Sequence, residues 1–177
     1  MEDLCTNKNI NPKVISIVST KSGMGKTTLI EGVIKVLKQK NYKVGVLKHD
    51  AHNFEIDKEG KDSYRFTKAG ADNVIINSSQ KLAMVQILKE QKKVEDILKL
   101  FVGVDVVIIE GFKNNKYPKI EVHRNGIDNR LLCEDNNFDS STFIAIASDE
   151  KLDKDIPILN INNHYQIAEF IVKSILK

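Results

Sequence analysis

The segment Ser19–Thr28, which reads S-T-K-S-G-M-G-K-T-T, carries the residue types that bind a polyphosphate. Gly23 and Gly25 allow the backbone to curl so that successive N–H groups point inward. A helix that we expect to begin near Thr27 adds unpaired amides and the positive end of its dipole. Lys26 can bridge the outer phosphates, and the hydroxyl of Thr27 can hold Mg²⁺. The segment therefore predicts a phosphate-binding loop, or P-loop.

The pattern G-x-x-x-x-G-K-[ST] is met except at its first position, where Thr20 replaces glycine. The context supports the P-loop over a chance glycine turn, because the apolar run Val14–Val18 predicts a buried strand just before the loop. An amphipathic helix is expected just after it, from Thr27 to Gln39. The residues predicted to bind the nucleotide in this segment are Lys21, Ser22, Gly23, Met24, Gly25, Lys26, Thr27 and Thr28.

Two acidic residues flank the most strand-like run of the chain, Val104–Ile109. Ligands of an α/β sheet bind outside the carboxyl ends of its strands. Asp105 stands at the start of the run, roughly 15 Å from the far end, so we expect it only to start the strand. Glu110 follows the far end, and we predict that it holds Mg²⁺ through water or orients a water molecule. Asp50, just past the expected strand Val44–Leu47, is a second candidate. The predicted catalytic residues are thus Lys26, Glu110 and Asp50, and the predicted Mg²⁺ residues are Thr27, Glu110 and Asp50.

Three further side chains near the expected site leave alternatives open. His49 and His52 share a loop with Asp50 and either contact phosphate or substrate or are plain loop residues, because a transition-metal site would need more ligands. Lys21 lies in K-S-G-M-G-K-T, which resembles the loop of partition-type ATPases, where an early lysine reaches the partner subunit's nucleotide. A solvated loop lysine is the simpler interpretation.

Strands and helices alternate along the chain, which predicts an α/β fold of the P-loop NTPase type, a mostly parallel sheet with helices on both faces. We expect a single nucleotide-binding domain over residues 1–177, with residues 1–12 as a flexible tail. Further expected strands are Val74–Ile76, Leu82–Ile87, Ile120–Val122, Phe143–Ala147 and Ile158–Leu159. Further expected helices are Ser63–Ala69 with Asp62 as its N-cap, Val94–Phe101, and a last helix capped by Asn162 or Asn163.

Composition excludes several other classes. The net charge is +3, and the basic residues alternate with acids, so a nucleic-acid partner is not expected. The apolar runs are far shorter than the roughly 20 residues of a membrane helix. The two cysteines, Cys5 and Cys133, form no metal-type pair and are expected to be free thiols. These features predict a cytoplasmic protein with neither nucleic acid nor membrane among its partners.

Other segments combine with the loop into a more selective pattern. In chain order they are T-K-S-G-M-G-K-T-T-L, L-K-H-D-A-H, D-K-E-G-K-D-S-Y-R-F-T-K-A-G-A, V-V-I-I-E-G-F-K and I-A-S-D. Together they resemble the MobB family, the molybdopterin-guanine dinucleotide biosynthesis adaptor proteins, from about Val14 to the C-terminal helix. Gly60–Tyr64, Ala69–Ala71 and Glu110–Lys113 are the most selective parts.

The resemblance implies a GTP-binding adaptor, a weak GTPase that assists the nucleotidyltransferase joining GMP to molybdopterin. It implies GTP and Mg²⁺ as cofactors, a MobA-type molybdopterin guanylyltransferase and molybdopterin as partners, and a homodimer. It also assigns phosphate and Mg²⁺ to Lys26 and Thr27. Residues of the family's second motif are expected to face the pterin or the partner, unless they form a solvated surface: Asp57, Lys61, Asp62 and Arg65. Lys113 and Lys119 are expected to meet phosphate groups of the product.

The choice of base has a separate candidate, because the common N-K-x-D motif is absent. Ala147-Ser148-Asp149 follows an expected strand at the equivalent place. A carboxylate on Asp149 could accept from the N1 and N2 hydrogens of guanine, and adenine lacks that pair of donors. The alternative is a loop acid that caps the residues after it.

Two other functions fit the same loop. A small-molecule kinase would bind its acceptor in the loop from His49 to Asp62 and use Asp50 as a base. A partition-type ATPase would act as a dimerising switch built around Lys21, although such proteins are usually longer and carry membrane or DNA elements.

Overall fold

A computed structural model of the protein describes residues 11–49, 54 and 56–177. Asp50, His52 and residues 1–10 of the expected tail lie outside the described residues, and the predictions for them stay predictions. The chain divides into two compact units, the first made of residues up to His49 and from Leu98 onward, the second of residues 50–97. Each unit is described by itself.

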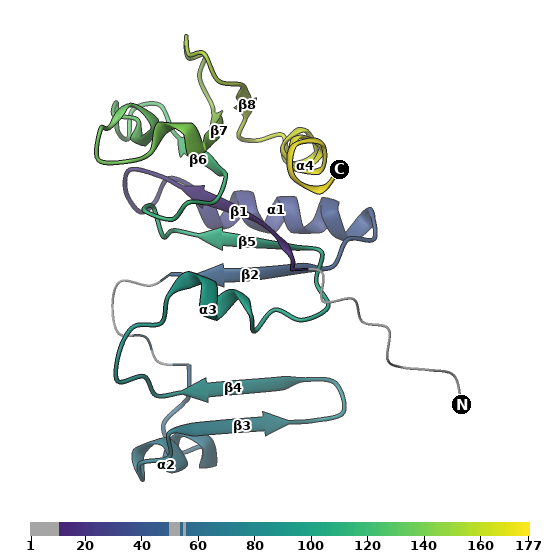
Figure 1. Ribbon diagram of the computed structural model, residues 1–177, viewed down its shortest axis with the longest axis vertical. Coiled ribbons are helices and arrows are strands. Elements are labelled where there is room, and N and C mark those ends of the chain that lie inside the picture. Colours follow the sequence, from purple (N-terminus) through teal and green to yellow (C-terminus); the bar gives the residue numbers. More distant parts are fainter. Residues whose placement is uncertain (1–10, 50–53, 55) are drawn as a thin grey trace. The chain divides into compact units, whose positions relative to one another are not determined.

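The first unit is built on a six-stranded sheet in which all neighbours are parallel, in the order β2-β5-β1-β6-β7-β8 (Figure 1). Parallel strands buried on both faces suit the β-branched runs that form them. The strands are β1 Lys13–Val18, β2 Val44–Lys48, β5 Val106–Glu110, β6 Lys119–His123, β7 Phe143–Ser148 and β8 Ile158–Asn160. Because β1 lies between β5 and β6, the loop that follows it opens at the centre of the carboxyl edge.

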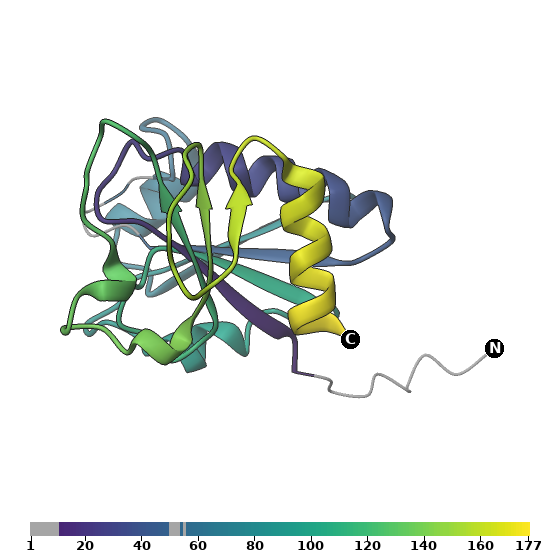
Figure 2. The same ribbon diagram turned by 90° about the horizontal axis from the view of Figure 1, so that it is seen from above.

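Two helices, α1 (Lys26–Gln39) and α4 (His164–Ile171), cover one face of this sheet and pack against each other (Figure 2). A π-helical segment, η3 (Val172–Leu176), continues α4. The expected cap of this last helix is confirmed, since the side chain of Asn163 accepts a hydrogen bond from the amide of Gln166 at 3.0 Å. The close approach of the helices requires Gly32 in α1, because a Cβ there would lie 2.1 Å from the imidazole of His164.

Shorter pieces cover the opposite face. The 3₁₀ helix η1 (Leu132–Glu134) and Phe143 pack with Val18 in a second apolar cluster, and η2 (Ser140–Thr142) leads into β7. The ring of Phe101 fills the space over Gly45 in β2. The expected sheet covered by helices is therefore confirmed, with the longer helices gathered on one side.

The second unit holds the helix α2 (Asp62–Lys68) and an antiparallel hairpin of β3 (Asn73–Asn77) and β4 (Leu82–Gln86). A turn joins the two strands, with a hydrogen bond of 2.8 Å from the amide of Ser78 to the carbonyl of Lys81. The prediction that Asp62 caps α2 is wrong, because Lys61 is the N-cap residue and Asp62 already lies in the first turn. There its charge still suits the helix dipole.

Most element bounds differ from the sequence expectation by one residue, and two differ by two residues or more. The strand expected at Val104–Ile109 begins at Val106, because the Asp105 carboxylate accepts a hydrogen bond of 2.6 Å from the amide of Lys43 and ties the turn before β5. The helix α3 covers only Val94–Leu98, since Phe101 leaves the helix to pack on Gly45. No described helix is long and apolar enough to cross a membrane.

Candidate functional site

The loop between β1 and α1 has a backbone that glycine makes possible. Gly23 and Gly25 have φ angles of 78° and 91°, in the left-handed region that other residues adopt only with strain. Thr20, at the position of the missing first glycine, is not among the described residues with positive φ, so a threonine fits there. Gly25 is the N-cap of α1 and offers no side-chain hydrogen bond to the first amides of that helix. Those amides remain suited to an anion.

Lys26 stands at the first position of α1 with its ammonium over the loop. Its Nζ donates a 2.9 Å hydrogen bond to Oγ of Ser19, which in turn donates to the Lys21 carbonyl at 2.7 Å. Burial lowers the pKa of Lys26, Glu110 opposes that shift, and the like charges of Lys113 and Lys48 add to it. Several positive charges thus converge on this loop, as a polyphosphate requires.

Thr27 and Glu110 meet at the carboxyl edge of the sheet. The Thr27 hydroxyl donates to Oε1 of Glu110 across 3.0 Å. Glu110 is the last residue of β5, whereas Asp105 precedes the strand at its other end, so the predicted placement of the two acids is confirmed. A hydroxyl and a carboxylate at this separation are hard oxygen donors that fit Mg²⁺, which keeps several waters. Among the described residues no group of three or more His, Cys, Asp or Glu side chains gathers for a metal, so phosphate oxygens and water would complete the shell.

Residues from later loops hold the outer side of the P-loop. Nζ of Lys113 donates to the carbonyl of Thr20 at 2.8 Å. Lys21 lies 3.7 Å from the carboxylate of Asp128, which also accepts two hydrogen bonds from the guanidinium of Arg130. Those bonds hold the pKa of Asp128 well below its ordinary value. Lys21 therefore has an ion pair within its own chain, and its reach to a partner's nucleotide stays a prediction.

His49 also lies at this edge. Its amide donates to the carbonyl of Glu110 at 3.0 Å, and its ring stacks on Phe112 with 4.0 Å between the ring centroids. The stack places the imidazole beside the strand end that carries Glu110. Contact of His49 with phosphate or substrate stays a prediction.

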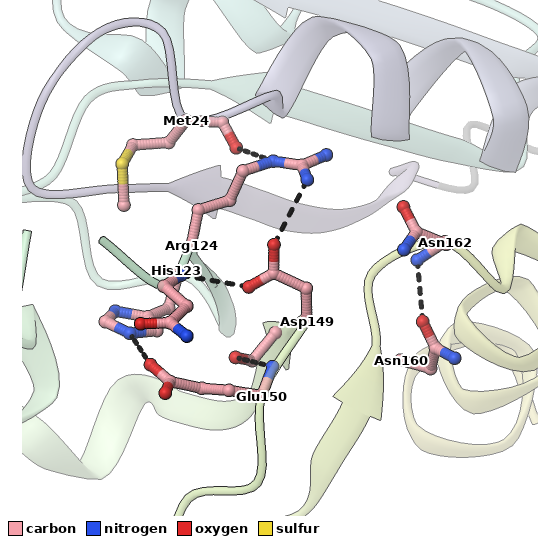
Figure 3. A network of polar contacts seen from close by, with 9 residues as sticks. Met24, His123, Arg124, Asp149, Glu150, Asn160 and Asn162 are labelled. Carbon is pink, nitrogen blue, oxygen red and sulfur yellow. Dashed lines mark hydrogen bonds and ion pairs between the residues drawn. The ribbon is translucent and has the colours of Figure 1, made fainter. Parts of the chain in front are cut away.

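Asp149 comes directly after β7 and is bound to the residues that follow β6 (Figure 3). Its Oδ1 accepts from the amide of Asn125 at 2.9 Å, and its Oδ2 accepts from the guanidinium of Arg124 at 3.2 Å. The Asn125 amide is the main cause of the lowered pKa of Asp149. Nε of Arg124 also donates to the carbonyl of Met24 in the P-loop, at 3.3 Å. Arg124 was not predicted from the sequence, although its position just after β6 places it at the carboxyl edge where ligands bind.

Two cavities open beside these residues. One, of about 500 Å³, lies at the ends of β7 and β8, and its wall includes Asp149, Asn160 and Asn162 (Figure 3). Asn160 and Asn162 face each other, and the backbone amide of Asn162 donates to Oδ1 of Asn160 at 2.9 Å. The other cavity, of about 550 Å³, is lined by Thr20 and residues of two loops, Lys113 and Arg130 among them.

Lys119 does not meet the expectation that it contacts a phosphate of the product. Lys119 begins strand β6 and is only 1% exposed. The ammonium donates to the carbonyls of Asn115 and Tyr117 and to the hydroxyl of Thr142. The prediction is wrong because all three donors of the ammonium are used within the protein.

The residues of the second motif lie in the second unit. The hydroxyl of Ser63 donates to Oδ1 of Asp57 at 2.9 Å, and Arg65 pairs with Asp62 at 3.5 Å on the exposed side of α2. Lys61 precedes this helix as its N-cap. A role of these side chains toward a pterin or a partner stays a prediction.

The parallel sheet, the glycine loop between β1 and α1 and the Thr27–Glu110 pair define a P-loop NTPase fold. The chain matches the family described as "MobB: Molybdopterin guanine dinucleotide synthesis protein B" over residues 14–149. This chain belongs to the MobB family.

Individual relatives agree with that assignment. The molybdopterin-guanine dinucleotide biosynthesis adapter protein of Haemophilus influenzae is 36% identical over 152 residues, which cover 85% of this chain and 83% of the relative. The protein of the same name from Escherichia coli is 35% identical over 160 residues, 86% of this chain and 87% of the relative.

Solved structures of the family share the fold. The crystal structure of molybdopterin-guanine biosynthesis protein B (mobB) has a TM-score of 0.68 and 28% identity, covering 90% of this chain and 98% of its own. The crystal structure of Bacillus subtilis MobB has a TM-score of 0.70 at 22% identity, over 92% of this chain and 98% of its own, and supports the fold alone. The chain therefore takes part in molybdenum cofactor biosynthesis as a MobB adapter protein.

Proposed function

We propose that this adapter protein binds GTP with Mg²⁺, hydrolyses it slowly, and assists a MobA-type guanylyltransferase in joining GMP to molybdopterin. The observation that carries the proposal is the pair of Thr27 and Glu110, 3.0 Å apart, beside the ammonium of Lys26. Metal ligands, a cation and free helix amides then converge on one side of the P-loop, and a nucleoside triphosphate needs all three.

Each group has a part in holding the triphosphate. The amides of Gly23 to Thr27 surround the phosphates, and the Lys26 ammonium exchanges its hydrogen bond with Ser19 for one to an outer phosphate. Mg²⁺, when bound, would neutralise the charge of the outer phosphates. Glu110 keeps Thr27 oriented toward the metal side. This carboxylate keeps further lone-pair positions, which can orient a water molecule as the sequence predicts.

Guanine is the base that suits the carboxylate beside the cavity at the ends of β7 and β8. Asp149 has a lowered pKa and so stays ionised near neutral pH. A carboxylate has about four lone-pair positions, so Asp149 can accept from guanine N1 and N2 while it keeps its two protein donors. Adenine would present an acceptor at N1 and be rejected.

An adapter works through partners, and the second unit offers surface for that. The β3–β4 hairpin exposes Ile75, Leu82 and Met84, at 60%, 65% and 44% of their full surface. Exposed apolar side chains gathered on one element mark partner surfaces. The proposed partners are the guanylyltransferase with its molybdopterin and a second copy of this chain, in the cytoplasm. The kinase alternative depends on Asp50, which lies outside the described residues, so no described contact favours it.

A calorimetric titration with GTP and ATP in the presence of Mg²⁺ tests the proposal. We expect GTP to bind in preference to ATP and to turn over well below the usual enzyme range of about 1–1,000 s⁻¹. Rapid phosphate transfer to an added small molecule would favour a kinase instead. Equal affinity for GTP and ATP would contradict the proposed base choice.

A further inference from the structure

Arg124 joins the two ends of the proposed nucleotide site (Figure 3). Its guanidinium contacts the carbonyl of Met24 in the P-loop and the carboxylate of Asp149 after β7, at 3.3 and 3.2 Å. We propose that Arg124 is a positioning residue that aims the Met24–Gly25 peptide at the phosphates, and that Asp149 holds the guanidinium in place. This inference depends on the proposed nucleotide binding and adds to it a link between the base side and the phosphate side.

The geometry of a peptide explains how a contact on one side controls a donor on the other. The C=O and N–H of a trans peptide point in opposite directions in one plane, and the described residues contain no cis peptide. Arg124 holds the Met24 carbonyl, so the amide of Gly25 points away from the guanidinium. That amide is one of the donors proposed to surround the phosphates.

The fit at Gly25 shows how closely the arginine lies against the loop. A Cβ built on Gly25 would be only 3.2 Å from Nε of Arg124. Gly25 has a φ of 91°. Because a glycine has no Cβ, its backbone can adopt other conformations unless the loop restricts it. The guanidinium supplies that restriction from outside the P-loop.

The guanidinium is itself held from β7. Asp149 uses one oxygen for Arg124 and the other for the Asn125 amide, so the carboxylate cannot turn away without losing a bond. The neighbouring pair of His123 and Glu150, 2.8 Å apart, ties the same two strand ends together. The planar fork of arginine can bridge two acceptors in this way, whereas a lysine ammonium is a single point.

A simple electrostatic role makes the opposite prediction for Asp149. If this carboxylate acted only through its charge, removing it would raise the affinity of the site for an anion. If it positions Arg124, removing it lowers that affinity even for a ligand that has no base. Asn at this position keeps one carbonyl oxygen, which can still accept from Arg124 in exchange for the bond to the Asn125 amide, whereas Ala keeps no acceptor. Charge and positioning therefore separate between the two variants.

The test measures the affinity of inorganic tripolyphosphate and of GTP, each with Mg²⁺, by calorimetry for the full chain. We expect Arg124→Lys and Asp149→Ala each to weaken tripolyphosphate about 5- to 10-fold, the worth of one hydrogen bond. The double variant should be no weaker than Arg124→Lys alone, and Asp149→Asn should keep most of the affinity. Asp153→Ala, which removes an exposed acid of the same loop, is the matched control and should not weaken binding.

Three results would overturn the inference: unchanged or tighter tripolyphosphate binding by Asp149→Ala, additive losses in the double variant, or equal losses in Asp149→Ala and Asp149→Asn. Thermal unfolding without ligand, measured on each variant, separates loss of fold from loss of binding, and Asp149→Asn retains its value if Asp149→Ala unfolds. If the wild-type chain binds neither ligand, the proposed function itself fails. If it binds GTP and the variants match it, only the inference on Arg124 fails.

Discussion

Lys26 is the residue whose charge the site most depends on. Its ammonium is half-buried in the loop and donates to Ser19, so a phosphate can replace that acceptor without moving the side chain far. A hydrogen bond between charged groups is worth about 1.5–3 kcal/mol. We predict that Lys26→Ala weakens GTP about 10- to 100-fold in a calorimetric titration. Lys35→Ala, on the exposed side of α1, is the control. Equal affinities for the two variants would place the phosphates elsewhere.

The lowered pKa of Lys26 gives a pH dependence with a definite sign. Burial is the main cause, and the pKa falls below the ordinary value of 10.5. Phosphate prefers the charged ammonium, so affinity for tripolyphosphate should fall as the pH rises through this lowered pKa. Lys26→Arg, which stays protonated, should delay the fall. A decline that is identical in both proteins would mean that Lys26 is not the group that titrates.

Without ligand, the same shift acts on stability in the opposite direction. Between the lowered pKa and 10.5 the unfolded chain binds the extra proton, so the contribution of Lys26 to the free energy of unfolding rises with pH. Bound phosphate removes this effect because it favours the charged form.

Thr27 and Glu110 should act together on the metal. The hydroxyl and carboxylate lie 3.0 Å apart, so loss of either removes an oxygen ligand or its orientation. We predict that Glu110→Gln and Thr27→Ala each reduce the gain in GTP affinity that Mg²⁺ provides, by about tenfold for one lost contact. Thr27→Ser keeps the hydroxyl and should retain that gain. Affinity measured with and without Mg²⁺ checks this, and an unchanged Mg²⁺ effect in Glu110→Gln would contradict it.

The loop residues were predictable from the sequence because they lie within one short pattern. Among residues that reach the loop from far along the chain, Glu110 was predictable because it follows a strongly apolar strand, whereas Arg124 and Asp128 were not predicted. Arg124 and Asp128 contact the P-loop from about a hundred residues away. The only local signal is the place of Arg124 just after an expected strand, and nothing in the local sequence marks Asp128. Lys119 shows the reverse error, since a basic residue in a selective segment was expected at a phosphate but is buried with its donors satisfied.

At the scale of elements, α1 is fixed against α4 by a contact that only glycine permits. A Cβ on Gly32 would overlap the ring of His164. Alanine favours a helix over glycine by about 1 kcal/mol, yet overpacking costs about 1–3 kcal/mol. We predict that Gly32→Ala lowers the free energy of unfolding, measured in urea, and that His164→Ala in the same chain restores most of the loss. A more stable Gly32→Ala protein would show that the helices can separate without cost.

Strands with continuous apolar runs were located well from the sequence, because burial on both faces leaves a strong signal. Their ends were less predictable, since tertiary contacts decide them. The carboxylate of Asp105 binds the amide of Lys43 and delays β5, and Phe101 leaves its helix for the space over Gly45. The N-cap of α2 lies one residue before the predicted one, because Lys61 has the extended backbone of an N-cap. A side-chain preference alone does not reveal this backbone conformation.

At the scale of the whole molecule, the proposed nucleotide site and the second motif belong to different compact units. Lys26, Glu110, Arg124 and Asp149 all belong to the first unit, and Asp57 to Arg65 belong to the second. An adapter that signals its nucleotide state to a partner has a use for such a division. The names of the relatives identify the process as molybdopterin-guanine dinucleotide biosynthesis. The site identifies the side chains and amides proposed to bind GTP in that process.

The most direct test of the account is a crystal structure of this chain with a non-hydrolysable GTP analogue and Mn²⁺ in place of Mg²⁺, whose anomalous signal locates the metal. We predict that the phosphates lie against the amides of Gly23 to Thr27 with Lys26 beside them, the metal at the Thr27 hydroxyl, and the guanine at Asp149. A triphosphate bound away from this loop, or a metal away from Thr27, would contradict it.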